Sequence, residues 1–379
     1  MILPRSRRLS RRSFLATSAA GIAGLGLAAC GTNTSAATVT RSSRLRVVNW
    51  PEYIPLASVD TIAGELGFEI AYDEIYEDNV SGFSDIIEPA LTSGGNPDFD
   101  LVVPTNWLAA QMIDDGWVEE LPLELIPNHI NIDPVYLTND FDRGSRFQMP
   151  WQGGITGIAF DPEQTNGPVT SIEQLFDAEL AGRVGLVGEM REAVGLAMLL
   201  NGDDPSRPTP STARAGLRVI TDLVERGHFA AIVFDDFVGL LSEGQLAATM
   251  AWSGQAAALQ FDRPDLGYAI PDEGGISWFD TMVIPRGASN IAGAAQWMNW
   301  AYNPDNAAEI SAFNLYVSPV LGTREALRRR GGDDAELADN PLIFPDADTR
   351  NRLFTWGTLD SETERQIEAE FDSLFAFFE

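Results

Sequence analysis

The stretch RLRVVNWPEYIPLASVDTIAGELGFEIAYDE, residues 44–74, predicts the fold of this chain. It begins with a short β-rich run from Leu45 to Asn49. Apolar residues then recur at helical spacing from Leu56 to Leu66, and Gly67 is expected to end that helix. From Phe68 to Tyr72 apolar and polar residues alternate, which is typical of a strand. Strand, helix and strand in this order are the opening of an α/β sheet.

The same alternation of strands and helices continues along the chain. A capping box, with Thr170 as N-cap and Glu173 three residues later, predicts the start of another helix. The other expected elements are helices over Ser81–Leu91 and Arg191–Leu200, and strands over Leu101–Val103, Val184–Val187 and Leu246–Ala251. The chain is long enough for two lobes, each with its own core, so we expect two open α/β lobes.

The N-terminal residues predict export. Five arginines precede an apolar run from Phe14 to Ala29, and no acidic residue occurs before Glu52. These features are typical of a secretory signal peptide over residues 1–29, and the apolar run is short for a membrane span. The segment Ser10–Leu15 resembles a twin-arginine export signal, which passes folded proteins.

The single cysteine predicts a lipid anchor. Leu27-Ala28-Ala29-Cys30-Gly31 resembles a bacterial lipobox, so Cys30 is expected to be lipidated and to become the new N-terminus. Residues 30–43 are rich in Ser, Thr and Ala and are expected to form a flexible tether. The protein is therefore expected outside the cytoplasm, anchored by lipid to the outer face of the cytoplasmic membrane. No thiol then remains for a disulfide, a metal site or nucleophilic catalysis.

The charge of the chain favours cationic partners. The sequence holds 55 acidic and 25 basic residues, a net charge of −30, and every basic residue is arginine. Loss of the signal's arginines makes the mature chain still more acidic. Such a surface repels nucleic acid and anionic lipid and attracts cations. An acidic, lysine-free composition is equally typical of a GC-rich or salt-adapted genome, so the charge only supports a cationic ligand.

Aromatic and acidic side chains follow the predicted strands. In open α/β sheets ligands bind beyond the carboxyl ends of strands, so these side chains are expected to gather at one site. Aromatic faces cover methylene groups and attract cations, and carboxylates accept hydrogen bonds from ammonium groups. The combination therefore favours an alkyl chain that carries ammonium groups. The candidates are Trp50, Tyr53, Thr105, Trp107, Glu189, Glu192, Trp252, Trp278 and Asp280.

Other functions fit the sequence less well. A metal site would need a cluster of His, Cys or Tyr ligands, but the only histidines, His129 and His228, lie far apart in the sequence. No Gly-x-Ser-x-Gly motif of a hydrolase occurs. Glu189 and Glu192 share one turn, which does not suit a glycosidase pair, although both could simply complement a helix dipole. A sugar-binding lipoprotein is the main alternative, because tryptophan-lined slots also stack sugar rings.

Motifs across the mature chain resemble the spermidine/putrescine-binding protein family. The run EGGISWFD, residues 273–280, is similar to the family's Glu-Gly-Gly-x-x-Trp-x-Asp at every fixed position. The other matching segments, in the family's order, are Asn49–Tyr53, Asp100–Thr105, Glu189–Glu192, Met250–Gly254, Tyr316 and Phe344–Ala347. The chain departs from the family's pattern at Pro51, where Thr is common, and near Trp356, where a Gln is expected.

This resemblance implies an α/β periplasmic binding protein of type II, with two lobes, a hinge and a cleft. It implies that Asp280 holds an amine within the ligand, that Glu189 and Glu192 hold a terminal ammonium, and that Thr105 adds a hydroxyl. The slot would be walled by Trp50, Tyr53, Trp107, Trp252 and Trp278, with Tyr316 near one end. We expect a monomer without cofactor or metal that binds a polyamine, performs no covalent chemistry and docks on an ABC permease.

We predict two discontinuous lobes. The first lobe comprises residues 44–155 and 280–324, and the second comprises 156–279 and 325–379. The chain is expected to cross between them, and to bend, at Trp151–Ile155 and Trp278–Asp280.

Overall fold

A computed structural model of the chain describes residues 42–75, 79–83, 87–93 and 98–378. The predicted signal peptide, Cys30 and residues 30–41 of the predicted tether lie outside this part. No helix in the described ranges is both long enough and apolar enough to span a bilayer.

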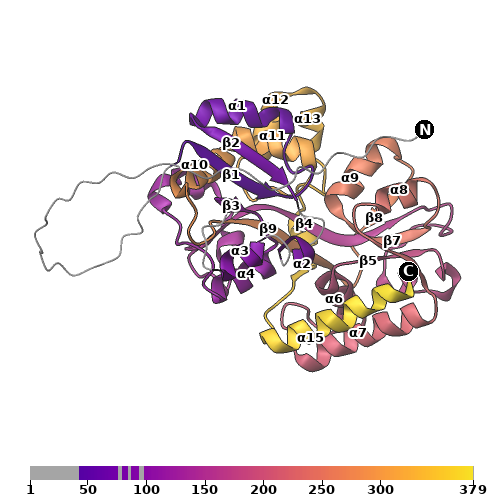
Figure 1. Ribbon diagram of the computed structural model, residues 1–379. Coiled ribbons are helices and arrows are strands. Elements are labelled where there is room, and N and C mark those ends of the chain that lie inside the picture. Colours follow the sequence, from indigo (N-terminus) through magenta and orange to yellow (C-terminus); the bar gives the residue numbers. More distant parts are fainter. Residues whose placement is uncertain (1–41, 76–78, 84–86, 94–97, 379) are drawn as a thin grey trace, which may run out of the picture. The chain divides into compact units, whose positions relative to one another are not determined.

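The described strands form one hydrogen-bonded path, shown in Figure 1. Their order is β2-β1-β3-β9-β4-β7-β5-β6, with β10 on β9 and β8 on β4. The strands are β1 (Arg44–Asn49), β2 (Glu69–Glu74), β3 (Leu101–Val102), β4 (Gln148–Phe160), β5 (Val184–Val187), β6 (Phe229–Val233), β7 (Ala248–Trp252), β8 (Gly267–Ala269), β9 (Gly275–Val283) and β10 (Leu353–Thr355).

Two long strands in the middle of this path join the two halves of the protein. β4 and β9 pair antiparallel along almost their whole lengths, from Gln148 opposite Val283 to Thr156 opposite Ile276, with a register shift at Trp151. One end of β9 pairs with β3, while the far half of β4 pairs with β7. Both segments predicted to link the lobes lie within this strand pair.

Helices cover both halves. They are α1 (Leu56–Leu66), α2 (Asn79–Gly82), α3 (Glu88–Thr92), α4 (Asn106–Asp114), α5 (Ile172–Leu175), α6 (Met190–Leu200), α7 (Pro210–Glu225), α8 (Phe237–Ser242), α9 (Ser253–Asp262), α10 (Ile291–Ala301), α11 (Pro304–Asn314), α12 (Thr323–Arg330), α13 (Gly332–Leu337), α14 (Ala347–Arg350) and α15 (Ser361–Asp372). Short 3-10 helices occupy Leu123–Leu125, Pro127–Asn131, Pro134–Leu137, Ala178–Leu180 and Ser373–Phe377.

The first lobe is built around the parallel strands β1, β2 and β3. The strand–helix–strand unit predicted from residues 44–74 is confirmed, and α1 ends at Gly67, whose left-handed backbone (φ 77°) closes the helix. Leu45, Leu101 and Trp297 are buried together, so α10 packs on the sheet as the largest part of this core.

The second lobe is built around β5, β6 and β7. α6 is buried on nearly all sides because its apolar residues contact the sheet on one face and α7 on the other. Val194, Ile220 and Ile367 belong to one buried cluster, which includes the C-terminal helix α15. α7 and α15 lie side by side in Figure 1.

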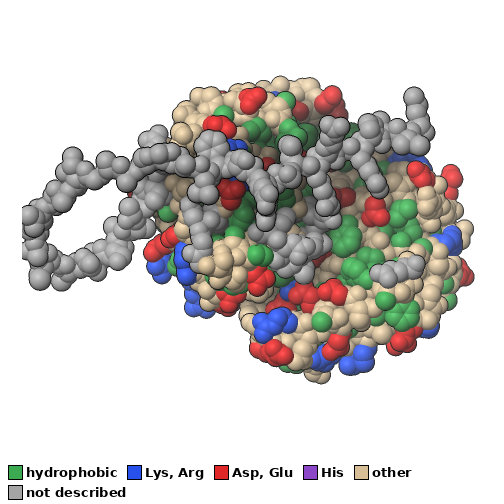
Figure 2. Space-filling view, viewed as in Figure 1, with side chains coloured by type: hydrophobic (Ala, Val, Ile, Leu, Met, Phe, Trp, Pro, Cys, Tyr) green, Lys and Arg blue, Asp and Glu red, His purple; other side chains and the backbone are tan. Residues whose placement is uncertain are grey.

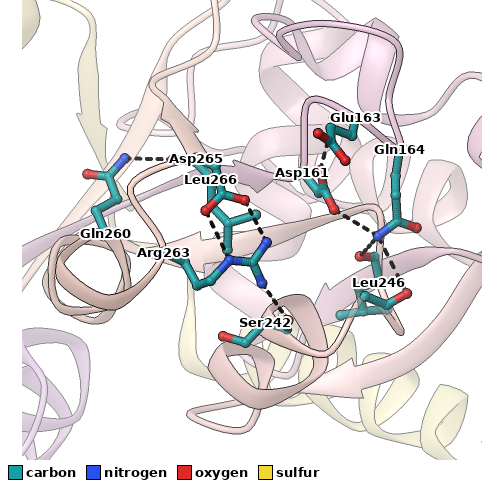
Figure 3. A network of polar contacts seen from close by, with 10 residues as sticks. Asp161, Glu163, Gln164, Ser242, Leu246, Gln260, Arg263, Asp265 and Leu266 are labelled. Atoms are coloured by element: carbon teal, nitrogen blue, oxygen red, sulfur yellow. Dashed lines mark hydrogen bonds and ion pairs between the residues drawn. The ribbon is translucent and has the colours of Figure 1, made fainter.

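An arginine joins two helix ends at the edge of the second lobe (Figure 3). The Arg263 guanidinium donates to the Ser242 carbonyl at the end of α8 and pairs with Asp265, just beyond α9. Gln164 reaches the same edge, where it contacts Asp161 and the carbonyl of Leu246. The network holds the loops that flank β7 and β8.

Three local expectations need correction. The capping box sits one residue later than predicted: Ser171 is the N-cap of α5 and Gln174 returns to it. β7 begins at Ala248, because the preceding Leu246 and Ala247 form no ladder with β4. Within the described residues, the helix predicted over Ser81–Leu91 is represented by α2 and α3, with Pro89 in the first turn of α3.

The C-terminal segment divides its contacts between the lobes. α12 packs against α11, α13 packs against α12, and Ala308, Leu327 and Ile343 belong to a shared buried cluster. Only after β10, which pairs with β9, does the chain reach α6 and α7 through α15. The boundary predicted after residue 324 falls inside α12, which packs on α11, so we propose a boundary near β10 instead.

Candidate ligand-binding site

A cavity of about 660 Å³ lies between side chains of the two lobes. Its size falls in the range typical of small-molecule sites. The lining residues are Trp50, Pro51, Glu52, Tyr53, Glu74, Asn79, Thr105, Glu189, Glu192, Phe234, Asp235, Trp252, Gly254, Gln255, Ala258, Trp278, Asp280, Phe313, Asn314 and Tyr316. Nine of the ten residues predicted for the site are among them, and Trp107 is the exception.

Five aromatic rings form a continuous wall. The centroids of successive rings are 6.2 Å apart for Trp50 and Tyr53, 6.0 Å for Tyr53 and Tyr316, 5.5 Å for Tyr316 and Trp278, and 6.4 Å for Trp278 and Trp252. Tilted and edge-on contacts of this kind stabilise each ring against its neighbour. The wall therefore offers ring faces along an extended slot.

Two glycines leave room for rings of this wall to pack directly against the backbone. A Cβ on Gly154 would lie 2.2 Å from the indole of Trp278, and one on Gly254 would lie 2.6 Å from the ring of Tyr316. Real side chains cannot approach that closely. The rings therefore rest directly on the backbone of β4 and on the first turn of α9.

Asp280 is the most deeply buried acid of the cavity, with 1% of its surface exposed. The Tyr53 hydroxyl donates to its Oδ2 at 2.5 Å, and the Thr105 hydroxyl donates to its Oδ1 at 2.7 Å. Burial raises the pKa of Asp280 to about 7, against the opposing effect of these two hydrogen bonds. A cation beside this carboxylate would favour its charged form.

Glu192 forms a second buried acid, supplied by the first turn of α6. Its Oε2 accepts hydrogen bonds from the Thr156 hydroxyl and, at 2.6 Å, from the Trp252 indole N–H. Burial raises the pKa of Glu192 to about 7, the two hydrogen bonds oppose that rise, and the charge of Asp280 adds to it. Glu189, at the N-cap of the same helix, lines the cavity and receives a long hydrogen bond of 3.5 Å from Asn79.

Trp107 does not line the cavity; it stacks on an arginine instead. The guanidinium carbon of Arg191 lies 3.4 Å from the centre of the Trp107 ring. The same guanidinium pairs with Glu364 and Glu368 of α15, each at 2.8 Å. Arg191 stands between the two predicted glutamates in the sequence, yet its charge is directed to α15. Local sequence pattern does not indicate these partners, because they lie more than 170 residues away.

The mouth of the cavity holds acids that were not predicted as site residues. Glu52 and Asp235 are exposed there, and the Gln255 amide donates to Asp235 while its oxygen accepts from the Tyr316 hydroxyl at 2.9 Å. Burial of part of the carboxylate, with the charge of Glu52, raises the pKa of Asp235. The strand-end argument would have found Asp235 if β6 had been recognised in the sequence.

The lining is acidic throughout. No arginine, lysine or histidine is among the described lining residues. The charged residues of the lining are all carboxylates, namely Glu52, Glu74, Glu189, Glu192, Asp235 and Asp280. Acidic side chains are also spread over the face shown in Figure 2. A second cavity of about 700 Å³, behind β4 and β9, includes Arg324 and Arg350 and so lacks this single-sign character.

The chain belongs to the bacterial extracellular solute-binding protein family, whose model matches residues 68–345. The spermidine/putrescine-binding periplasmic protein of Escherichia coli is 28% identical over 336 residues, which cover 87% of this chain and 89% of that protein. The spermidine/putrescine-binding periplasmic protein 1 of Haemophilus influenzae is 25% identical over 316 residues, covering 83% and 84%.

A solved structure supports the fold. The spermidine/putrescine ABC transporter substrate-binding protein PotD of Streptococcus pneumoniae superposes with a TM-score of 0.74 at 23% identity, covering 89% of this chain and 100% of that one. The predicted α/β two-lobed binding-protein fold and the resemblance stated from the sequence are therefore confirmed.

Proposed function

We propose that this protein captures a polyamine, spermidine or putrescine, in the acidic cavity and delivers it to an ABC importer. The observation that carries the proposal is the pairing of an all-carboxylate charge lining with a five-ring aromatic wall. A polyamine has the complementary form, because its methylene groups are apolar and its amines are cationic. The names of the relatives agree with this assignment.

The energies involved are sufficient for tight binding. Each ring face beside an ammonium group contributes about 0.5–2 kcal/mol. Each carboxylate that accepts a charge-assisted hydrogen bond contributes about 1.5–3 kcal/mol. Asp280 and Glu192, with Trp252 and Trp278 beside them, would together offset the cost of association and leave about −8 kcal/mol, a micromolar dissociation constant.

Binding is proposed to favour the closed arrangement of the lobes. Tyr53 and Thr105 follow strands β1 and β3 of the first lobe, while Glu192 on α6 and Trp252 at the end of β7 belong to the second lobe, so both lobes supply the lining. A ligand that contacts both sides binds the closed form better, and so shifts the equilibrium towards it. We propose that the closed monomer docks on the permease, while the signal peptide directs export and lipid on Cys30 holds the protein at the outer face of the cytoplasmic membrane.

Calorimetric titration of the mature domain tests the proposal. Spermidine or putrescine should bind with a micromolar or lower dissociation constant, and the affinity should fall as salt rises, because ion pairs are screened. A neutral oligosaccharide should give no heat. Heat with the oligosaccharide and none with either amine would overturn the proposal and favour the sugar-binding alternative.

A further inference from the structure

Two threonine hydroxyls each donate to a buried carboxylate and each accept from an N–H group on their other side. Thr156, on β4, is fully buried and lies behind the cavity wall. Thr105 lies beside Asp280. A hydroxyl has one proton, so an external donor that occupies its oxygen dictates where that proton points.

The direction of the Thr156 proton is fixed by an indole. The Trp278 N–H, which cannot accept a hydrogen bond, donates to the Thr156 hydroxyl oxygen at 3.2 Å. The proton of Thr156 therefore turns to Glu192, the other hydrogen-bond partner of this hydroxyl among the described residues. Because the Trp252 indole donates to the same carboxylate oxygen, both neighbours of Glu192 are donors. A proton on Oε2 would displace one of these two hydrogen bonds, whereas the ionised carboxylate accepts both.

The Thr105 proton is fixed in the same way by an amide. The side-chain oxygen of Asn79 accepts from the Thr105 backbone N–H at 3.2 Å, which orients the amide. Its nitrogen then donates to the Thr105 hydroxyl oxygen at 3.0 Å, and the hydroxyl proton points to Asp280. The indole of Trp278 on β9 and the amide of Asn79 on α2 thus each direct a threonine proton onto a carboxylate.

We propose that Thr156 and Asn79 are positioning residues that direct hydroxyl protons onto Glu192 and Asp280, and so hold both carboxylates in the ionised, cation-accepting form. Burial alone favours the neutral acids. Hydrogen bonds donated to the charged form oppose that tendency. The inference rests on the proposed function only in that the charge would serve a cationic ligand.

The Thr156 hydroxyl also connects the aromatic wall to a carboxylate of the cavity. Thr156 accepts from Trp278 and donates to Glu192, so the position of the aromatic wall and the charge of the carboxylate depend on one hydroxyl. Removing that hydroxyl would take one hydrogen bond from each of them. A threonine that only filled space would affect neither the position of the ring nor the charge of the carboxylate.

The test is Thr156→Val, which keeps the shape of the side chain and removes its hydroxyl. Thr156→Ser restores the hydroxyl, and Thr249→Val is the matched control. Thr249 is equally buried in the same sheet, but the hydrogen bonds that its hydroxyl donates within the described part of the chain go to backbone carbonyls. Spermidine affinity is measured by calorimetry from pH 5.5 to 9, and the carboxyl pKa values of the ligand-free protein by carbon NMR.

In Thr156→Val the pKa of Glu192 should rise, and affinity at pH 7 should fall roughly 5- to 10-fold, the size of one lost charge-assisted hydrogen bond. The Ser variant and the Thr249 control should keep the wild-type pH profile. Asn79→Leu should raise the pKa of Asp280 instead. Wild-type titrations in both Thr156→Val and Asn79→Leu would overturn the inference. If the wild type bound no polyamine, the proposed function would fail, while the ligand-free NMR titration would still decide this point.

Discussion

Replacing Asp280 with asparagine should weaken ligand binding and stabilise the empty protein at alkaline pH. Asp280 is almost fully buried, and its pKa of about 7 lies well above the value of 3.8 for a free aspartate. A carboxylate whose folded pKa is raised contributes its full stability below the unfolded pKa, and loses that stability as pH rises through the folded value. The wild type should therefore become less stable between pH 4 and pH 8.

The difference between the two pKa values corresponds to about 4 kcal/mol when the group is fully ionised. Asparagine avoids this cost. It cannot accept from both Tyr53 and Thr105 in the same manner, which costs about 1 kcal/mol. Asp280→Asn should therefore raise the free energy of unfolding at pH 8 by about 2–3 kcal/mol, while polyamine affinity falls about 10- to 100-fold with the loss of the charge.

Urea denaturation of the ligand-free protein at pH 5.5 and pH 8, with calorimetry for the ligand, measures both effects. Asp142→Asn is the matched control: Asp142 is also buried, but it accepts backbone N–H groups of Arg146, Phe147 and Gln148. That variant should be less stable at both pH values. Equal stability of the wild type at pH 5.5 and pH 8, or an Asp280→Asn protein less stable than wild type at pH 8, would refute the reasoning.

Two further changes test the wall and the contact beside it. Gly254→Ala should displace the ring of Tyr316 and weaken polyamine binding, measured by calorimetry, at least tenfold. In the control Gly239→Ala the added Cβ meets no atom within 4 Å, so this variant should bind as the wild type does. Equal affinity in both variants would show that the position of the ring is unimportant. Trp107→Ala removes the face on which Arg191 stacks but no lining residue, so affinity should change less than about fivefold, and a larger loss would return Trp107 to the site.

Local pattern predicted much of the fold. The alternation over residues 44–74 indicated β1, α1 and β2, and the glycine after α1 marked its end. The strand-end argument brought Trp50 and Trp252 to one cavity, because carboxyl ends of neighbouring strands meet at one edge. Asp280 reaches the same cavity for another reason, since it lies inside the antiparallel strand β9 and not beyond a strand end.

The larger errors concern packing, which local sequence pattern does not determine. The rule that placed Trp252 in the site also selected Trp107, but a guanidinium supplied by α6 covers its ring. The packing of α12 on α11 depends on small buried residues such as Ala308 and Ala326, which local periodicity does not assign to a lobe. The directions of the Thr156 and Thr105 protons depend on donors from other elements.

Because Arg191 pairs with α15, the charge around the cavity depends on whether α15 has already been synthesised. Glu364 and Glu368 follow Arg191 by more than 170 residues, so a growing chain carries the Arg191 guanidinium beside Glu189 before either partner has been made. Until α15 arrives, that guanidinium is an internal cation next to the cavity's own acids. The negative charge of the cavity therefore depends on a helix that lies outside its lining.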